Sequence, residues 1–452
     1  MNKKDKLEFE TIKSHKNRLY FLCGFVCVVI LLIVLITNHS LAKYRTTESI
    51  PLINGTINYT SYDLKMVAMY QEENGDYKSI DTVPTSGYSL NEEKSYCEVN
   101  DTKDNNRTIE YQNGVINFLG MPKKGTKCYL YFDEQILAKD IILANSKINE
   151  GEPDFSQVAT TDEGIYKAED DWGESYYFRG DVTNNWIKFA GYYWRIIRIN
   201  GDGSIRLIYN GTGTATTGTS TQISTSAYNS SYYDNAYVGY MYGSTGASSY
   251  AATYANTNNS TIKGVLDNWY QTNITNKGYG DKVSKEAGFC NDRKISTVNR
   301  SGYGTLGYGT NATVYAPVDR FLNASWSWLS TQNPTLKCSQ LSNDMFTVSG
   351  SSKGNKALAN PVGLITADEV VFAGGKGGTN NSSYYLYTGQ NYWTMSPFDF
   401  YDGHADVFFV HSNGNLNYSN VYGAIGVRPV INIASNVTIK SGDGTISNPY
   451  VI

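Results

Sequence analysis

Charge and histidine are both scarce in this chain of 452 residues. Asp, Glu, Lys and Arg together make up 18 % of the chain, and it has 4 His, whereas a globular protein is usually about 25 % charged. The net charge of −4 provides no excess of Lys and Arg to neutralise phosphates, so no nucleic-acid partner is expected. The chain also lacks H-E-x-x-H and P-loop motifs, and the sequence therefore does not predict an enzyme.

Aromatic residues, in contrast, are plentiful. The chain contains 38 Tyr, 16 Phe and 7 Trp, whereas disordered chains lack the aromatic side chains that build a core. Much of the remainder is Gly, Ser, Thr and Asn. This composition is typical of loop-rich β structure and of surfaces that combine rigid aromatic contacts with adaptable hydrogen bonds.

A long apolar run near the N-terminus predicts a membrane anchor. Leu19–Ile36 contains no charged residue and has about the length of a membrane-spanning helix. Residues 1–18 carry six Lys or Arg against three Asp or Glu, which favours a cytoplasmic tail. We therefore expect an anchor over residues 19–37 and a stalk over residues 38–50, with the rest of the chain outside the cell. The alternative is a signal peptide cleaved near Ser40-Leu41-Ala42.

Four cysteines lie beyond the apolar run: Cys97, Cys128, Cys290 and Cys338. An even number of cysteines in an oxidising compartment favours disulfides, and four cysteines allow three pairings. The expected division into two domains favours Cys97–Cys128 and Cys290–Cys338. Zinc binding is the alternative role of these cysteines, but the Cys-x-x-Cys spacing of zinc sites is absent.

Residues 51–145 are expected to form a small all-β domain, an immunoglobulin-like sandwich that acts as a spacer. Strands are predicted at residues 63–70, 114–119 and 127–132, where apolar and polar residues alternate between turn signals. Residues 146–172 are polar and are expected to form a linker that ends in Glu169-Asp170-Asp171. Calcium is a conceivable cofactor of these carboxylates, but the EF-hand spacing is absent and no metal site is predicted.

Local signals organise the second domain, expected over residues 173–452. Asn200-Gly201-Asp202-Gly203 separates two β-prone runs and predicts a hairpin. Apolar residues recur at helical spacing over residues 261–270, and Thr366 is placed to cap a second short helix. Arg428 stands between apolar residues, and we expect it to form an internal ion pair with Asp368 or Glu369.

The C-terminal part of the chain resembles a known fold. The run WTMSP at residues 393–397, a hairpin and then GVRPVI at residues 426–431 resemble domains of the C-type lectin or formylglycine-generating-enzyme type. The resemblance implies an α+β domain, β-rich with long loops, whose binding face lies on late strands and loops. Nearly the whole chain is similar to uncharacterised cell-surface proteins of Firmicutes. The formylglycine-generating oxidases need late reactive cysteines, and this chain has none after Cys338.

The same C-terminal segment is similar to the variable segment of proteins diversified by retroelements. In those proteins, the residues that vary line the binding face of a lectin-type fold. The matching positions, which are our candidate ligand-binding residues, are Asp399, Phe400, Tyr401, Asp402, His404, Asp406, His411, Asn413, Asn415, Asn417, Tyr418, Asn420 and Tyr422. Aromatic rings among Asp, His and Asn suit sugar rings or a protein epitope.

The sequence thus predicts a membrane-anchored extracellular protein that recognises a glycan or protein ligand through its C-terminal domain. One alternative is an architectural or adhesive envelope protein without a discrete ligand site. A further alternative is a hydrolase that acts on the cell wall through Asp399, Asp402 and Asp406, because paired carboxylates cleave glycosidic bonds.

Overall fold

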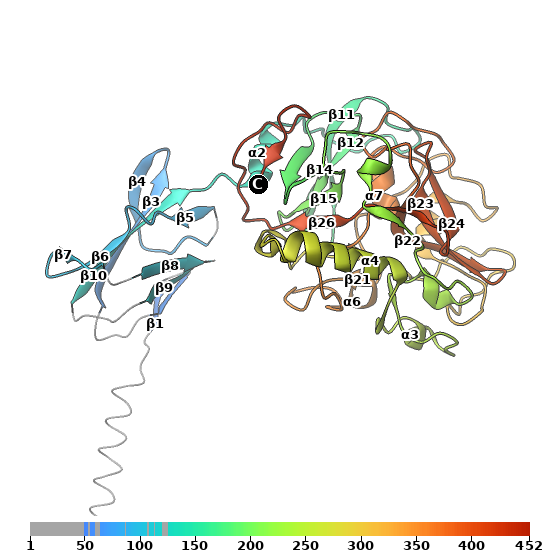
Figure 1. Cartoon of the computed structure of the whole chain (residues 1–452), viewed down its shortest axis with the longest axis horizontal. Coiled ribbons are helices and arrows are strands. Elements are labelled where there is room, and N and C mark those ends of the chain that lie inside the picture. Colours follow the sequence, from blue (N-terminus) through green and yellow to red (C-terminus); the bar gives the residue numbers. More distant parts are fainter. Residues whose placement is uncertain are drawn as a thin grey trace, which may run out of the picture. The chain divides into compact units, whose positions relative to one another are not determined.

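A computed structural model describes residues 49–52, 55–58, 64–85, 87–105, 108–112, 114–119 and 125–452 (Figure 1). The chain divides into two compact units, Met1–Gln135 and Ile136–Ile452. The expected tail and anchor, residues 1–37, lie outside these ranges. Within them, no helix is long and apolar enough to cross a membrane.

The first unit contains two sheets that share one core. The first sheet has the order β1 (Ser49–Leu52), β2 (Gly55–Asn58), β9 (Val115–Leu119), β8 (Thr108–Gln112). The second has the order β4 (Asp76–Ile80), β3 (Leu64–Glu73), β10 (Thr126–Glu134), β6 (Tyr96–Val99), β7 (Thr102–Lys103), and β5 (Tyr88–Leu90) pairs with β10. Ile116 of the first sheet packs with Met69, Leu130 and Phe132 of the second. The described part of this unit is therefore sandwich-like.

The disulfide of the first unit joins two neighbouring strands of one sheet. Cys97 on β6 lies directly opposite Cys128 on β10, and the two are bonded. The predicted pairing is thus confirmed. The three strands predicted in this region correspond to β3, β9 and β10.

The second unit is built on two larger sheets. The first has the order β11 (Asp162–Glu169), β12 (Glu174–Gly180), β14 (Tyr192–Ile199), β13 (Trp186–Phe189), β27 (Tyr450–Val451), while β15 (Ile205–Tyr209) joins β14 to β26 (Val430–Ile433). The second has the order β16 (Ser224–Ser226), β25 (Ile425–Val427), β22 (Tyr392–Tyr401), β23 (His404–Val410), β24 (Leu416–Asn420), and β20 (Thr313–Val314) pairs with β22. Two short ribbons pair β17 (Met241–Tyr242) with β18 (Asn258–Asn259) and β19 (Phe289–Cys290) with β21 (Met345–Phe346).

Short helices and long loops surround these sheets. The α-helices are α2 (Ala138–Ala144), α3 (Tyr250–Thr253), α4 (Thr261–Tyr270), α5 (Ala316–Phe321), α6 (Leu341–Asp344) and α7 (Ala367–Phe372). A π-helical turn, η3 (Gln271–Thr275), continues α4, and 3₁₀ turns form η1 (Thr219–Thr221), η2 (Asn235–Val238) and η4 (Gly280–Lys282). Helix α7 packs against β12 of one large sheet and against β22, β23 and β24 of the other (Figure 1). It therefore ties the two large sheets together.

Several local predictions for this unit are confirmed. β14 and β15 form the predicted hairpin, with Ile199 opposite Ile205 across the turn. The helix predicted over residues 261–270 is α4. Thr366 caps α7 in a full capping box, in which its side chain accepts from the Glu369 N–H and the Glu369 side chain accepts from the Thr366 N–H.

The boundary between the two units differs from the expected one. Residues 136–145, expected in the first domain, contain α2, whose Ala138 and Ile142 are buried in the core of the second unit. Residues 146–172, expected as a linker, contain β11, which pairs with β12 along its length. The polar composition of this stretch reflects the residues that precede β11 and the two exposed ends of the strand, Asp162 and Glu169.

Candidate functional site

Three neighbouring strands place a pair of carboxylates on one face of the second large sheet. Asp399 of β22 lies directly opposite Asp406 of β23, and Asp406 in turn lies opposite Asn420 of β24. Directly opposed residues of adjacent strands project from the same face of a sheet, with Cβ atoms roughly 5 Å apart. The two carboxylates are therefore nearest neighbours across β22 and β23.

Aromatic residues lie in register on both sides of this carboxylate pair. Tyr401 lies opposite His404 at one side, and Phe408 lies opposite Tyr418 at the other. Strand alternation puts all four on the same face as the carboxylates. Phe408 is buried in the core, whereas Tyr401 and Tyr418 are exposed and His404 is partly exposed. Exposed rings therefore lie on either side of the carboxylate pair.

Rings from the loops extend this surface. Tyr232 stacks on the His404 ring with centroids 5.2 Å apart, and it also contacts Tyr422 at 4.8 Å and Tyr233 at 6.1 Å. The backbone carbonyl of Tyr232 accepts a hydrogen bond from the N–H of Ala405 at 2.8 Å, which fixes this loop against β23. We call the exposed rings together with His404 the aromatic face. Its members are Tyr232, Tyr233, Tyr401, His404, Tyr418 and Tyr422.

A second layer of rings, of which Phe398 is buried and Tyr303 and Trp326 are partly buried, supports the exposed ones. Tyr401 stacks on Tyr303 with centroids 4.8 Å apart, and Tyr418 stacks on Phe398 at 3.7 Å. Trp326 contacts both Tyr303 and Phe398. The exposed rings are thus held in fixed orientations, so a ligand that stacks on them does not have to order them first.

The carboxylate pair is short of hydrogen-bond partners. Asp399 is 4 % exposed, and its Oδ2 accepts a hydrogen bond from the Tyr303 hydroxyl at 2.9 Å. The buried Oδ1 atoms of Asp399 and Asp406 accept none. Leaving a buried polar atom unsatisfied costs about 1–3 kcal/mol, so this arrangement is unfavourable for the folded chain on its own.

Both carboxyl groups consequently bind protons more tightly than usual. Burial raises the pKa of Asp399 to about 8, and the charge of Asp406 adds to the increase. Burial likewise raises the pKa of Asp406 to about 6, while His404 acts in the opposite direction. Near neutral pH the pair therefore holds about one proton between its two carboxyl groups.

Most other buried carboxylates in this unit lie against arginine, although Asp234 is held by backbone N–H groups instead. Five of them have an oxygen between 2.5 and 3.1 Å from a guanidinium nitrogen. The pairs are Asp170 with Arg198, Asp344 with Arg293, Glu369 with Arg198 and Arg206, and both Asp292 and Asp368 with Arg320. Asp399 and Asp406 make no ion pair with any Lys or Arg in the described ranges. The charge on the aromatic face is thus not neutralised by a salt bridge.

Two residues of the predicted site, Phe400 and Asp402, do not belong to the aromatic face. Phe400 is 1 % exposed and belongs to the core, because it projects from β22 away from the face that carries Asp399 and Tyr401. Its expected contact with a ligand is therefore wrong. Asp402 lies exposed in the β22–β23 turn with φ at 47°, and its carbonyl oxygen is 2.9 Å from Nδ1 of His404.

Four further predicted residues lie at the opposite end of the β23–β24 hairpin. His411, Asn413 and Asn415 form its turn, in which the N–H of Asn415 donates to Asn413 Oδ1 at 3.2 Å and the His411 N–H donates to the Asn415 carbonyl at 2.9 Å. Asn417 lies opposite Phe409, on the other face of the sheet from Asp406. The structure thus separates these four from the carboxylate pair. Asn420 and Tyr422 stay beside it, and the N–H of Tyr422 donates to Asn420 Oδ1 at 3.3 Å.

Sequence reasoning missed the residues that come from distant loops. Tyr232 and Tyr233 lie in the Tyr-rich loop before η2, and Tyr303 and Trp326 lie on either side of α5. Tyrosine is abundant throughout the chain, so nothing in the local sequence distinguishes these rings from the others. Only the fold brings them to the β22–β24 face.

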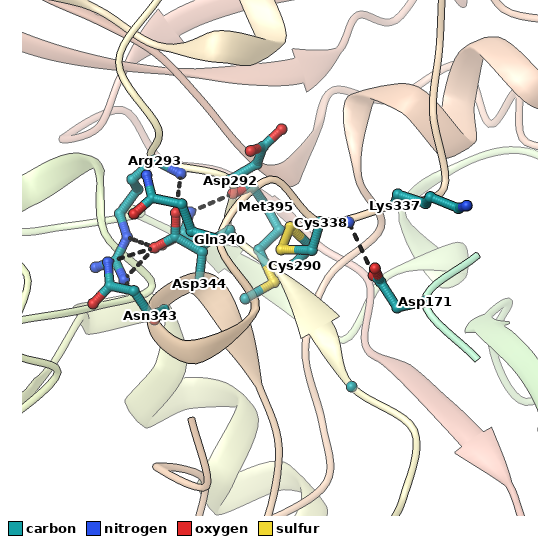
Figure 2. Close-up of a disulfide and its surroundings, with 12 residues drawn as sticks. Asp171, Cys290, Asp292, Arg293, Lys337, Cys338, Gln340, Asn343, Asp344 and Met395 are labelled. Carbon is teal, nitrogen blue, oxygen red and sulfur yellow. Dashed lines mark hydrogen bonds and ion pairs between the residues drawn. A yellow bond between two sulfur atoms is a disulfide. The ribbon is translucent and has the colours of Figure 1, made fainter. Parts of the chain in front are cut away.

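A second charged cluster surrounds the other disulfide, Cys290–Cys338, whose predicted pairing is confirmed. Figure 2 shows this bond between Asp171, which accepts the Cys338 N–H at 2.9 Å, and the buried Arg293–Asp344 pair. Arg293 and Asp344 neutralise each other and Asp171 binds the backbone of Cys338, so we interpret the cluster as structural. Among the residues that the structure describes, no group of three or more His, Cys, Asp or Glu could hold a metal ion.

The expected partner of Arg428 is also wrong. Its guanidinium donates to the carbonyl oxygens of Tyr209 and Leu386 at 3.1 and 3.2 Å and to Asn210 Oδ1 at 3.3 Å. Asp368 and Glu369 are instead neutralised by other arginines. Two backbone carbonyl oxygens and an asparagine side chain take the place of the expected carboxylate.

Known proteins provide no relative with which this geometry can be compared. No family model, no curated protein and no solved structure matches the chain.

Proposed function

We propose that the chain is anchored in the cell membrane by its N-terminal segment and binds an extracellular ligand non-covalently through the aromatic face. The ligand is a glycan or a protein. The observation that carries the proposal is the gathering of five exposed tyrosines, each 37–59 % exposed, around a pair of carboxylates. Scattered exposed apolar residues are normal, but a contiguous group marks an interaction site.

The surface is chemically suited to such ligands. Tyrosine rings provide apolar planes on which a sugar ring or an apolar side chain stacks, and their hydroxyls form hydrogen bonds at the rim. Tyr401 and Tyr418 are supported by stacked rings beneath them. Because the face is ordered before binding, little conformational entropy is lost when a ligand is bound.

The finer assignment of the fold belongs to the same proposal. We assign the second unit to the C-type-lectin-like domains and the first to the immunoglobulin-like spacers, as in the Firmicutes surface proteins that the sequence resembles. The position of the aromatic face on the late strands β22, β23 and β24 supports the first assignment. Diversification of these positions by a retroelement is part of the proposal. It predicts adenine-directed substitutions in the codons for residues 399–422 within a population grown from one clone.

Binding of the purified full-length chain to arrays of glycans and of surface proteins tests the proposal. We expect Tyr401→Ala and Tyr418→Ala each to weaken binding of the selected ligand about tenfold or more, as for aromatic residues at the centre of an interface. Ile446→Ala is the matched control, because Ile446 and Tyr418 are both 43 % exposed and Ile446 lies outside the aromatic face.

An architectural role predicts a different result. An envelope protein without a discrete ligand site would self-associate in a concentration-dependent manner, and Tyr401→Ala and Tyr418→Ala would leave that association unchanged. Finding this behaviour, and no saturable binding on either array, would overturn the proposal.

One observation favours a second candidate, a glycoside hydrolase. Asp399 and Asp406 are adjacent carboxyl groups with separated, raised pKa values of about 8 and about 6, and glycosidases use one protonated and one ionised carboxyl group. Asp402, which the sequence grouped with them, is exposed in the neighbouring turn. Release of soluble sugars from cell-wall glycan that is abolished by Asp399→Asn and by Asp406→Asn, but not by Asp402→Asn, would establish this activity.

A further inference from the structure

We infer that the ligand of the aromatic face carries an organic ammonium group, which binds beside Asp406 and Asp399 and is flanked by Tyr401 and Tyr418. The inference rests on the proposed function and names the ligand chemistry of that same face. The observation that carries it is the carboxylate pair of Asp399 and Asp406, which has no paired Lys or Arg in the described ranges and lies between Tyr401 and Tyr418.

The first step is the missing cation. Asp399 and Asp406 are adjacent, and each has one buried oxygen without a hydrogen-bond partner. Arg300 is near enough to lower the pKa of Asp399, but it forms an ion pair with Asp319 at 2.7 Å. Burying a carboxylate without a paired cation is costly, whereas elsewhere in this unit the chain supplies an arginine. A cation from outside the chain would supply the missing charge.

The second step is the kind of cation that fits. Tyr401 and Tyr418 lie on opposite sides of the carboxylate pair, both roughly half exposed and both held by rings beneath them. Aromatic faces attract cations, and rings combined with carboxylates recognise ammonium groups such as choline or methylated lysine. A bare metal ion fits less well, because no group of three metal-ligating side chains is found in the described part of the chain. The geometry therefore favours an organic ammonium group.

The third step is access. Asp406 is partly exposed, unlike Asp399. It lies between Asp399 and Asn420 in the register. A ligand that reaches the face from solvent therefore meets Asp406 first, and Asp399 lies directly opposite Asp406 and is more deeply buried. The hydroxyl of Tyr303 donates to Oδ2 of Asp399, which leaves Oδ1 as the oxygen without a partner.

The raised pKa values supply a supporting consequence. The unliganded pair holds a proton near neutral pH, and an ammonium group that binds beside it favours the ionised form, so binding releases a proton. Affinity for an ammonium probe should therefore increase as the pH rises from 5 to 8. Tyr303, Tyr401, Tyr418, Arg300 and His404 are the other titratable groups around the pair. His404→Gln isolates the contribution of the imidazole.

Choline and its uncharged isostere 3,3-dimethylbutan-1-ol provide a matched pair of probes. They have the same shape and differ in the charge. We expect choline to bind the full-length chain at least tenfold more tightly than the isostere, measured by saturation-transfer NMR titration at pH 7.5. Asp406→Asn should remove this preference, while Asp402→Asn, a change to an exposed carboxylate in the adjacent turn, should leave it intact.

Two further pairs of probes distinguish the source of the ammonium group. Glucosamine oligomers are compared with their N-acetylated forms, and a lysine peptide is compared with its acetylated form. Preference for the charged member of either pair, lost in Asp406→Asn, supports the inference and identifies the source as a glycan or a protein.

The inference and the proposed function can fail separately. Equal binding of choline and its isostere, or binding of neither together with a Tyr418-dependent ligand from the arrays that carries no ammonium group, would overturn the inference and leave the proposed function standing. If no array ligand and no probe depends on Tyr401 or Tyr418, the proposed function fails as well.

Discussion

Asp399 and Asp406 lie directly opposite each other on β22 and β23, and each keeps one buried carboxylate oxygen without a hydrogen-bond partner. Asp292 also has a buried oxygen without a hydrogen-bond partner, but it is ion-paired with Arg320, whereas Asp399 and Asp406 form no ion pair with Lys or Arg in the described ranges. Buried polar atoms are nearly always satisfied in folded proteins, so a buried carboxylate pair without a cation calls for an explanation. Sites that violate the rules of stable folding are commonly functional. The rings of Tyr401 and Tyr418 on either side of the pair make ligand binding the explanation we favour.

The carboxylate pair makes stability depend on pH. Burial raises the pKa of Asp399 to about 8, above the value near 4 of a carboxyl group in an unfolded chain. Between these values the folded chain binds more protons than the unfolded chain, so this contribution to stability is present at low pH and is lost as the pH rises through about 8. As the pH rises from 6 to 8, the free energy of unfolding of the wild-type chain should therefore fall more steeply than that of Asp399→Asn. The two slopes should differ by about 1 kcal/mol per pH unit.

Denaturant titrations at several pH values measure this slope. Asp402→Asn serves as the control, because Asp402 is exposed in the adjacent turn and asparagine tolerates its positive φ. Parallel pH profiles for the wild-type chain and Asp399→Asn would show that the pair does not titrate in this range.

The buried ion network beside α7 should be sensitive to the loss of a single charge. Glu369 lies 3.1 Å from Nε of Arg198 and 2.5 Å from Nε of Arg206, and all three side chains are buried. Glu369→Gln leaves two guanidinium groups short of negative charge, and we expect a loss of about 3–5 kcal/mol in the free energy of unfolding. Lys167→Met, which removes the half-exposed pair with Glu174 at 3.8 Å, should change it by less than about 1 kcal/mol. Similar losses in both variants would contradict this interpretation.

The Cys290–Cys338 disulfide should stabilise the second unit. Its cysteines are 48 residues apart in the sequence, so the bond restricts a long loop in the unfolded chain and contributes about 4 kcal/mol. The double variant Cys290→Ser with Cys338→Ser should therefore increase hydrogen exchange of the β14 and β22 amides. The matched double variant at Cys97 and Cys128 should affect the β3 and β10 amides of the first unit instead. Unchanged exchange in the second unit would show that this disulfide adds no stability there.

The cap of α7 offers a test on a smaller scale. The Thr366 side chain accepts a hydrogen bond from the Glu369 N–H at 3.1 Å, and losing such a cap costs about 1 kcal/mol. Thermal unfolding should show this loss in Thr366→Ala and restore most of the stability in Thr366→Ser, which keeps the hydroxyl. If serine and alanine behave alike, the threonine methyl group rather than the cap accounts for the effect.

The features that the sequence predicted correctly depend on local signals. The Asn200–Gly203 turn, the Thr366 cap and the 3.6-residue spacing in α4 each involve residues within one or two turns of chain. Both disulfide pairings followed from assigning each pair of cysteines to its own domain. The pairing was therefore insensitive to the domain boundary, which lay ten residues from its expected position.

The features that the sequence missed depend on contacts between distant segments. Tyr232 and Tyr303 reach the β22–β24 face from loops about 100 residues or more before it, and tyrosine is too common in this chain for either to stand out. Phe400 was misplaced because alternation along β22 turns it away from Asp399. The partners of Arg428 are backbone carbonyls, which every residue carries and no sequence pattern identifies.

The central claim is that the aromatic face binds a ligand, and the most direct test is the affinity of the full-length chain for its array-selected ligand. We predict that Tyr418→Ala weakens this affinity about tenfold or more, while Ile446→Ala leaves it within twofold of the wild-type value. Equal affinities in the wild-type chain and both variants would contradict the account, because they would place the binding surface elsewhere.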